Sequence, residues 1–259
     1  MRARLDQHFL VDPAVAARIV DAARPREAES IVEIGPGRGI LTERLLAAGA
    51  SVTAIEIDER LHANLASRYA AEARLKLIRA DFLGLDLSIL PQRCKIVSNL
   101  PYSVASPILQ RILPWPGWSE AILMFQKEVA ERLEAGPGGR DYGILSISVA
   151  LHASAERLFD VGRFSFRPAP KVQSSVVRLL RMDTSPLPDG VSPEEVLRVA
   201  KAAFSQRRKM AANSISSTLG LDRVAVVSAL ESCGIAPTAR GETIGLDAFA
   251  RLAVALRPR

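Results

Sequence analysis

The first 130 residues alternate short β-branched runs with longer amphipathic stretches, and this alternation restricts the fold more than any other feature of the chain. The runs predict parallel strands, and the stretches, apolar on one face, predict helices that cover the sheet. An α/β fold with a doubly wound sheet follows, and such sheets bind ligands beyond the carboxyl ends of their strands. Strands are expected at residues 30–34, 51–57, 75–80, 95–98 and 121–125, and crossover helices at 41–48 and 60–71.

The second half of the chain changes character at residues 183–192, where two prolines and a glycine interrupt regular structure and indicate a domain boundary. Before this boundary, two apolar runs are expected to close the sheet as a terminal antiparallel pair. After it, the spacing of apolar residues predicts only helices. The closing strands are expected at 144–150 and 174–180, and the helices at 194–204, 210–219, 224–233 and 246–256.

Basic residues are unevenly distributed, although the whole chain carries a net charge of only +6. Residues 1–139 contain 17 basic and 17 acidic side chains, whereas residues 140–181 contain seven basic and three acidic ones. Arg207, Arg208 and Lys209 are contiguous beyond them. Such surfaces attract polyanions because neutralised phosphates release their counterions. A solvated arginine-rich face without a partner explains the charge pattern equally well.

The two cysteines, Cys94 and Cys233, are far apart and lack CxxC spacing or a neighbouring histidine cluster. This arrangement predicts neither a disulfide framework nor a metal site, and it favours a reducing, cytoplasmic location. The amino terminus is polar, and no apolar run approaches the length of a bilayer, so we expect no association with a membrane.

A glycine-rich segment, EIGPGRG at residues 33–39, follows the first expected strand and precedes a helix. Gly35 and Gly37 allow the backbone to pass close beneath a nucleotide-like cofactor. Ile40 stands where a GxGxxG dinucleotide fingerprint requires its third glycine, which disfavours a nicotinamide oxidoreductase. Taken alone, the segment fits an ordinary strand-to-helix turn equally well.

Two acidic residues are expected at the carboxyl ends of the next strands, on the same edge of the sheet as the glycine loop. Glu56 is suited to accept hydrogen bonds from ribose hydroxyls. Asp81 is suited to accept from an adenine amine, with Phe82 beside the ring. Each acid alone fits a helix-capping carboxylate, but together with the loop they indicate one cleft for an adenosine-bearing ligand.

Asn99-Leu100-Pro101-Tyr102 follows the fourth expected strand, and these residue types suit the methylation of an adenine amine. The side-chain carbonyl of Asn99 and the main-chain carbonyl of Leu100, whose direction Pro101 restricts, can accept the N6 hydrogens. These bonds favour charge that develops on N6 during attack. Tyr102 can stack on a base extruded from RNA. An Asn-Pro turn explains the tetrapeptide in isolation, but not its place beside the expected cleft.

Four further motifs occur along the chain, one before the glycine loop and three after the tetrapeptide. They are QHFL at residues 7–10, QKEVA at 126–130, FRPAPKVQS at 166–174 and FSQRRK at 204–209. In these motifs and in their order, the chain resembles the KsgA-type ribosomal RNA adenine dimethyltransferases over nearly its whole length. The resemblance implies a Rossmann-like class I methyltransferase sheet with a smaller C-terminal all-helical domain. It implies a catalytic domain that binds S-adenosylmethionine at residues 1–182 and a helical RNA-binding domain at residues 183–259.

The resemblance also implies roles for individual residues. Phe166 would assist Asn99, Leu100, Pro101 and Tyr102 in holding the target base. The residues implied for cofactor binding are His8, Leu10, Gly35, Gly37, Glu56, Asp81 and Asn99. Those implied for RNA binding are Arg167, Lys171, Arg207, Arg208 and Lys209.

The implied activity is dimethylation of two adjacent adenosines in the 3′-terminal hairpin loop of small-subunit ribosomal RNA. The implied partner is that RNA within an assembling 30S subunit, and a monomer without a metal is expected. Asp6 replaces the glycine usual in the family, and only five residues precede it, which bears on RNA affinity more than on chemistry.

Two alternatives stay open on the sequence. A large-subunit enzyme of the macrolide-resistance type shares the superfamily, although Leu100 and the full-length helical domain favour the small-subunit enzyme. A non-catalytic RNA-binding assembly factor would account for the basic residues, but Asn99 and Tyr102 argue for retained chemistry.

Overall fold

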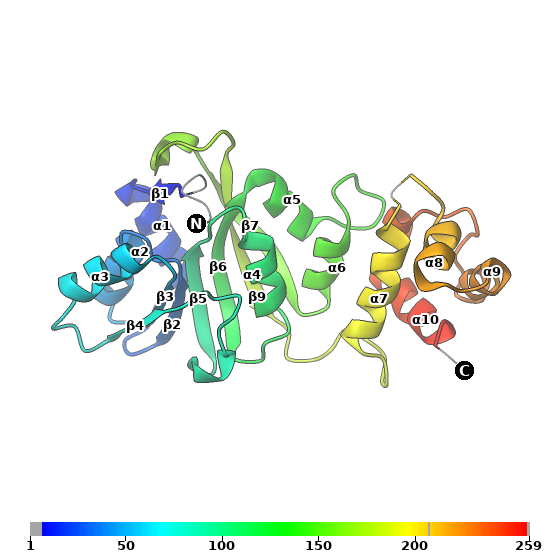
Figure 1. Ribbon diagram of the computed structural model, residues 1–259, viewed down its shortest axis with the longest axis horizontal. Helices are drawn as coiled ribbons and strands as arrows, with labels where there is room; N and C mark the ends of the chain where they lie inside the picture. The colour runs from blue at the N-terminus through cyan, green and yellow to red at the C-terminus, as the bar shows by residue number, and fades with distance from the viewer. Residues whose placement is uncertain (1–6, 207, 258–259) are drawn as a thin grey trace. The chain divides into compact units, whose positions relative to one another are not determined.

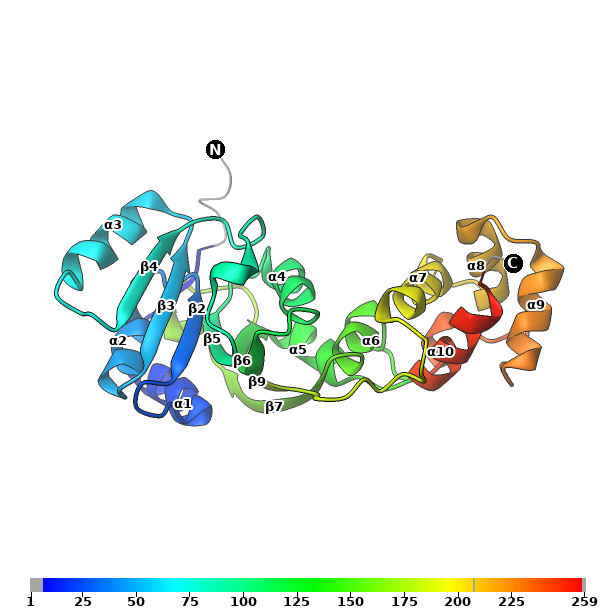
Figure 2. The ribbon, with the colours of Figure 1, turned by 90° about the horizontal axis from the view of Figure 1, so that it is seen from below.

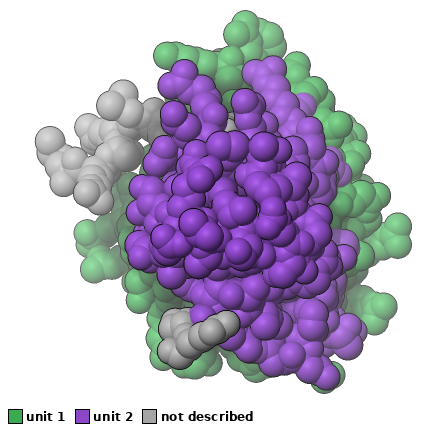
Figure 3. Space-filling model, turned by 90° about the vertical axis from the view of Figure 1, so that its right-hand side faces the viewer, with its two compact units in different colours: residues 1–130, 155–181 green, residues 131–154, 182–259 purple. Residues whose placement is uncertain are grey.

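The computed structural model describes residues 7–206 and 208–257, which form two compact units (Figure 3). Unit 1 consists of Met1–Ala130 and Ala155–Arg181, and unit 2 of Glu131–Ser154 and Met182–Arg259. The chain therefore enters unit 2 twice. The second entry begins at Met182, next to the segment 183–192. Residues 131–154 belong to unit 2, whereas the family resemblance implies a catalytic domain that runs through residue 182.

Unit 1 is built on a seven-stranded sheet with the strand order β4-β3-β2-β5-β6-β9-β7 (Figure 1). The first five strands in this order pair in parallel, whereas β9 pairs with β6 in antiparallel register. Strand order reverses between β2 and β5, which creates a crevice at their carboxyl ends. The strands are β2 (Ser30–Ile34), β3 (Ser51–Glu56), β4 (Leu75–Arg79), β5 (Cys94–Asn99), β6 (Trp118–Gln126), β7 (Ala153–Val161) and β9 (Ser174–Arg181).

Helices α1 (Pro13–Ala23) and α2 (Ile40–Ala47) share one apolar core with the sheet of unit 1, to which Ile19, Leu45 and Val97 belong. The side chain of Asp12 caps α1 by accepting hydrogen bonds from the backbone amides of its first turn. Helices α3 (Glu59–Arg68), α4 (Ala105–Ile112) and α5 (Lys127–Glu134) follow β3, β5 and β6.

A separate two-stranded ribbon joins the amino-terminal segment to the chain between β7 and β9. Strand β1 (Phe9–Leu10) pairs with β8 (Phe166–Arg167), with Leu10 opposite Phe166. A short 3₁₀ helix, η2 (Arg163–Ser165), immediately precedes β8. Another, η1 (Leu87–Ile89), lies between β4 and β5.

The prediction of a strand at residues 144–150 is wrong, because this segment forms helix α6 (Ile144–Ala150) of unit 2. Local sequence favoured a strand, since the segment contains two isoleucines and a valine. Packing overrides that preference: Ile147 joins the core of unit 2, and the hydroxyl of Ser146 donates to the Arg132 carbonyl. The strand that closes the sheet beside β9 is β7, which begins three residues after α6.

Unit 2 contains the four helices that were expected, with ends within two residues of the predicted ones (Figure 2). They surround a core that includes Val199, Ile215, Leu230 and Phe249. These helices are α7 (Pro193–Phe204), α8 (Ala211–Leu219), α9 (Arg223–Ser232) and α10 (Leu246–Ala255), and the short turn η3 (Gly241–Thr243) precedes the last of them.

Cys94 and Cys233 are both free and buried, and burial raises the pKa of the Cys94 thiol to about 12. Within residues 7–206 and 208–257, no helix has the length and apolar character that crossing a bilayer requires.

Candidate active site

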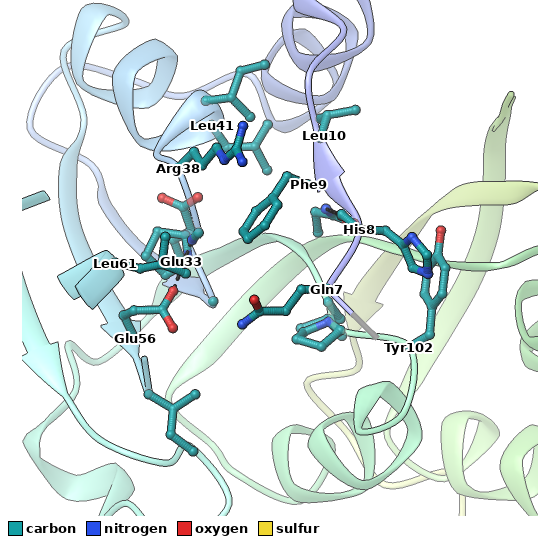
Figure 4. A pocket seen from close by; sticks show the side chains of 18 residues that line it. Gln7, His8, Phe9, Leu10, Glu33, Arg38, Leu41, Glu56, Leu61 and Tyr102 are labelled. Atoms are coloured by element: carbon teal, nitrogen blue, oxygen red, sulfur yellow. Dashed lines mark hydrogen bonds between the residues drawn. The ribbon is translucent and has the colours of Figure 1, made fainter. Parts of the chain in front are cut away.

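A cavity lies at the carboxyl edge of the sheet, where strand order reverses (Figure 4). About 770 Å³ of space free of protein atoms lies among its lining residues, open solvent at the mouth included. Its walls come from four segments that are distant in sequence: the amino-terminal segment, the glycine loop after β2, the end of β3 and the tetrapeptide that begins at the end of β5. The lining residues are Gln7, His8, Phe9, Leu10, Glu33, Gly35, Pro36, Gly37, Arg38, Ile40, Leu41, Glu56, Ile57, Leu61, Asn99, Leu100, Pro101 and Tyr102.

The glycine loop adopts a conformation that side chains rarely tolerate. Gly35 and Gly37 have φ angles of 67° and 58°, in the left-handed region. A Cβ atom on Gly37 would also lie 3.2 Å from the ring of Phe9, which is a tight contact. The loop thus presents bare backbone to the cavity, as the sequence predicted.

Glu56 ends β3, and its buried carboxylate connects the loop to the strand. Its two oxygens accept hydrogen bonds from the backbone amides of Gly37 at 3.0 Å and Asp58 at 2.9 Å. Burial raises the pKa of Glu56, and these hydrogen bonds oppose the shift. Because each carboxylate oxygen has two lone pairs, these two hydrogen bonds leave acceptor capacity for a ligand hydroxyl.

Glu33 is a second buried carboxyl in the wall of the cavity, and the sequence motifs predicted no role for it. The hydroxyl of Thr42 donates to it at 2.6 Å. Burial raises the pKa of Glu33 to about 8, so the group is largely protonated at neutral pH in the protein without ligand. The one signal of this site in the sequence was an acid inside the otherwise apolar run IVEI.

Because the pKa of Glu33 is raised, we expect the free energy of unfolding of the protein to depend on pH. Its pKa is higher in the folded chain than the ordinary value of 4.5, so its contribution is complete below about pH 4.5 and is lost as the pH rises through about 8. Over this pH interval the free energy of unfolding should fall more in the wild type than in Glu33→Gln. The difference between the two decreases is expected to be on the order of a few kcal/mol. Urea unfolding at several pH values measures the difference, and parallel profiles for the two proteins would contradict the assigned pKa.

Asn99 is the last residue of β5, and its side-chain amide faces the amino-terminal segment. Its Nδ2 lies 3.5 Å from the carbonyl oxygen of His8, a long hydrogen bond. Among residues 7–206 and 208–257, none donates a hydrogen bond to its Oδ1. Pro101 packs over the glycine loop, since a Cβ on Gly35 would lie 3.7 Å from the Pro101 ring. The two motifs that the sequence placed at one sheet edge therefore share a wall.

Tyr102 is half-buried and is held from two sides. Its hydroxyl lies 2.5 Å from Oγ of Ser174, the buried first residue of β9, and its ring centroid lies 5.6 Å from that of His8. Burial raises the pKa of Tyr102, so its hydroxyl stays protonated at neutral pH. The Nδ1 atom of His8 lies 2.7 Å from the Pro168 carbonyl. Ser174 was not predicted as a site residue, although it ends the FRPAPKVQS motif.

Two of the residues predicted for catalysis or cofactor binding lie outside the cavity lining. Phe166 is 1% exposed and packs in the core of unit 1 opposite Leu10. Asp81 is exposed, and its carboxylate accepts a hydrogen bond from the Leu83 amide at 2.9 Å. Their assigned roles stay predictions.

The basic residues predicted to bind RNA are distributed over both units. Arg167 and Lys171 are exposed on unit 1, and Arg208 and Lys209 are exposed on unit 2. Arg207 and Asp6 lie outside the described residues.

The chain matches the family model of ribosomal RNA adenine dimethylases over residues 1–253. It is 40% identical to the ribosomal RNA small subunit methyltransferase A of Pseudomonas aeruginosa, and the alignment covers 97% of this chain and 93% of that protein. It is 41% identical to the protein of the same name from Methylococcus capsulatus, with 99% and 98% covered.

Two crystal structures share its fold along nearly the whole chain. A dimethyladenosine transferase from Plasmodium falciparum has a TM-score of 0.79 and 26% identity, covering 95% of this chain and 96% of that one. The 23S rRNA methyltransferase ErmE has a TM-score of 0.71 and 27% identity, covering 96% and 99%.

Proposed function

Because the chain belongs to the ribosomal RNA adenine dimethylase family, we propose that it dimethylates N6 of two adjacent adenosines in the 3′-terminal hairpin loop of small-subunit ribosomal RNA. The main observation in support of this proposal is that Asn99 and Tyr102 line the same cavity as the glycine loop and Glu56. The similarity to ErmE means that the fold alone does not separate small-subunit from large-subunit enzymes. Three relatives at 40 to 42% identity that are named small-subunit methyltransferases favour the former.

The residues of the cavity fit S-adenosylmethionine, the methyl donor of this family. Gly35 and Gly37 form a cradle that a Cβ atom would partly fill, and Glu56 keeps acceptor capacity for ribose hydroxyls. The carboxyl of Glu33 suits a cationic group of the ligand. A positive charge next to it would lower the pKa of Glu33, and the resulting carboxylate would attract that charge. When bound, the donor supplies an electrophilic methyl group on a sulfonium. His8 and Leu10 would close the cavity from the amino-terminal side.

The target amine would be activated by hydrogen-bond acceptors alone. Oδ1 of Asn99 and the carbonyl oxygen of Leu100 would accept the two N6 hydrogens, which stabilises positive charge as it develops on that nitrogen. No general base is needed before methyl transfer, because the amine can lose its proton afterwards. Tyr102, oriented by its hydrogen bond to Ser174, would stack on the base. Alignment of amine and donor supplies much of the remaining rate enhancement.

Ribosomal RNA is the substrate, and we propose that it is bound within an assembling 30S subunit by a monomer that uses no metal, in the cytoplasm. Arg167 and Lys171 beside the site, and Arg208 and Lys209 on unit 2, would contact phosphates.

Replacing both Arg208 and Lys209 with alanine is expected to weaken RNA binding and to lower the slope of log affinity against log salt by about 1 to 2. Fluorescence anisotropy at several salt concentrations measures the slope. The matched control is the double alanine variant of Arg26 and Lys76, two exposed cations of unit 1 outside the cavity lining. An unchanged slope for the Arg208 and Lys209 variant would remove both residues from the interface.

The proposed function is tested by incubating the enzyme with undermethylated small subunits, with large subunits in parallel, and with isotopically labelled donor. Mass mapping of the RNA should locate two methyl groups on each of two neighbouring adenosines near the 3′ end of the small-subunit RNA. Label in the large-subunit RNA alone would favour the macrolide-resistance type of enzyme. Tight binding without label would favour a non-catalytic assembly factor.

A further inference from the structure

The segment between β7 and β9, residues 162–173, forms a fixed wall next to the active site. The Val11 amide donates to the carbonyl of Ser165 at 2.9 Å, and the Ser165 hydroxyl donates to Asp12 at the same distance. Beyond this turn, Pro168 contacts His8, and Ser174, the next residue after the segment, contacts Tyr102. Of these contacting residues, His8 and Tyr102 line the cavity. The segment is therefore held in place against residues that line the cavity.

Phe164 projects from this wall into solvent. It is 79% exposed, more than any other large hydrophobic side chain among the described residues, whereas Phe166 two positions later is 1% exposed. The guanidinium of Arg163 lies 4.8 Å from the Phe164 ring centroid. Single exposed apolar residues are common on proteins and need no explanation. An exposed aromatic ring with an arginine over it, on a segment hydrogen-bonded to residues around the cavity, is a more specific arrangement.

The charge of the segment determines which partner the ring suits. Arg163, Arg167 and Lys171 are all exposed, and the sequence contains no acidic residue between Asp160 and Asp183. An aromatic face on a segment with three exposed cations matches single-stranded nucleic acid, where the base stacks and the backbone carries the negative charge. An apolar protein surface would gain nothing from the three cations.

We propose that Phe164 and Arg163 form a stacking platform for an unpaired nucleotide that flanks the target adenosine. This inference rests on the proposed function, because extruding one loop base into the cavity separates its neighbours from their stacking partners. The platform replaces part of that lost stacking on the enzyme. It contributes to RNA binding and leaves the methyl-transfer step itself unchanged.

Three substitutions of Phe164 test the platform, with equilibrium binding of undermethylated small subunits as the first measurement. Phe164→Ala is expected to raise Kd by about tenfold, and Phe164→Leu by nearly as much, because leucine retains apolar area but has no π face. Phe164→Trp should bind like the wild type or better. The control is Ile89→Ala, which removes another exposed apolar side chain of unit 1 and should leave Kd unchanged.

Steady-state kinetics on the same subunits provide the second measurement. Phe164→Ala should raise KM for the subunit with kcat within about twofold of the wild type, as expected for loss of uniform binding. Wild-type affinity for Phe164→Ala would overturn the proposal. Wild-type affinity for Phe164→Leu would also overturn it, in favour of a plain apolar contact with a protein. If the wild type binds but transfers no methyl group, the proposed function fails, while the binding series still decides the role of Phe164.

Discussion

Asn99→Ala is expected to lower the rate of methyl transfer by roughly 100-fold or more and to leave RNA affinity within about twofold of the wild type. The reason is that Oδ1 of Asn99 accepts no hydrogen bond from the described residues, so it is free to stabilise charge that appears on N6 only during the reaction. An interaction made only in the transition state affects kcat and not substrate binding. Single-turnover transfer to small subunits measures the effect directly.

Cofactor binding separates the proposed role of Asn99 from general damage to the cavity. Calorimetric titration of Asn99→Ala with S-adenosylmethionine should show an affinity close to that of the wild type, because the 3.5 Å contact of Asn99 with His8 is too long to stabilise the wall strongly. Transfer at the wild-type rate by this variant would remove Asn99 from the mechanism. Loss of cofactor affinity together with transfer would instead give Asn99 the cofactor-binding role that the family resemblance implies.

Glu56→Ala is expected to weaken S-adenosylmethionine binding by about 10- to 100-fold. Two effects act in the same direction. The substitution removes the acceptor for ribose hydroxyls, and it also leaves the backbone amides of Gly37 and Asp58 without their partner, so the glycine loop loses its tie to β3. The measurement is the same calorimetric titration.

Glu56→Gln distinguishes these two effects, and Glu59→Ala is the matched control. Glutamine retains one side-chain acceptor oxygen but places an amide donor against the second backbone amide, so we expect an intermediate affinity. Glu59 lies three residues further along, and its exposed carboxylate pairs with Arg79 at 2.8 Å. Its removal should not change cofactor affinity. An unchanged affinity for Glu56→Ala would exclude Glu56 from the cofactor site.

The strands that carry the site were predictable because each is a short apolar run bounded by turn residues. β2 through β6 lie within three residues of their expected ends. Since the carboxyl ends of parallel strands meet at one sheet edge, the order of motifs along the chain was enough to assign Gly35, Glu56 and Asn99 to one cavity. The error at residues 144–150 has the opposite origin, because a short segment of five apolar residues and two serines fits a buried helix as well as a strand.

The contacts that complete the site could not be predicted. His8 touches Pro168, and Tyr102 touches Ser174, across more than 70 residues of sequence. Glu33 is identified as a group with a raised pKa only by its burial. None of these properties leaves a periodic signal in the chain.

By itself the sequence determined the α/β architecture of the first unit, the four helices of the second and the strand tips that present the reactive side chains. Local periodicity encodes these features, because each element must bury one face. Only the tertiary structure decided that residues 131–154 join unit 2, that Phe166 packs into the core, and that Phe164 remains exposed to solvent. Those outcomes depend on which remote segments exclude water from a side chain, and no local pattern of residues specifies that.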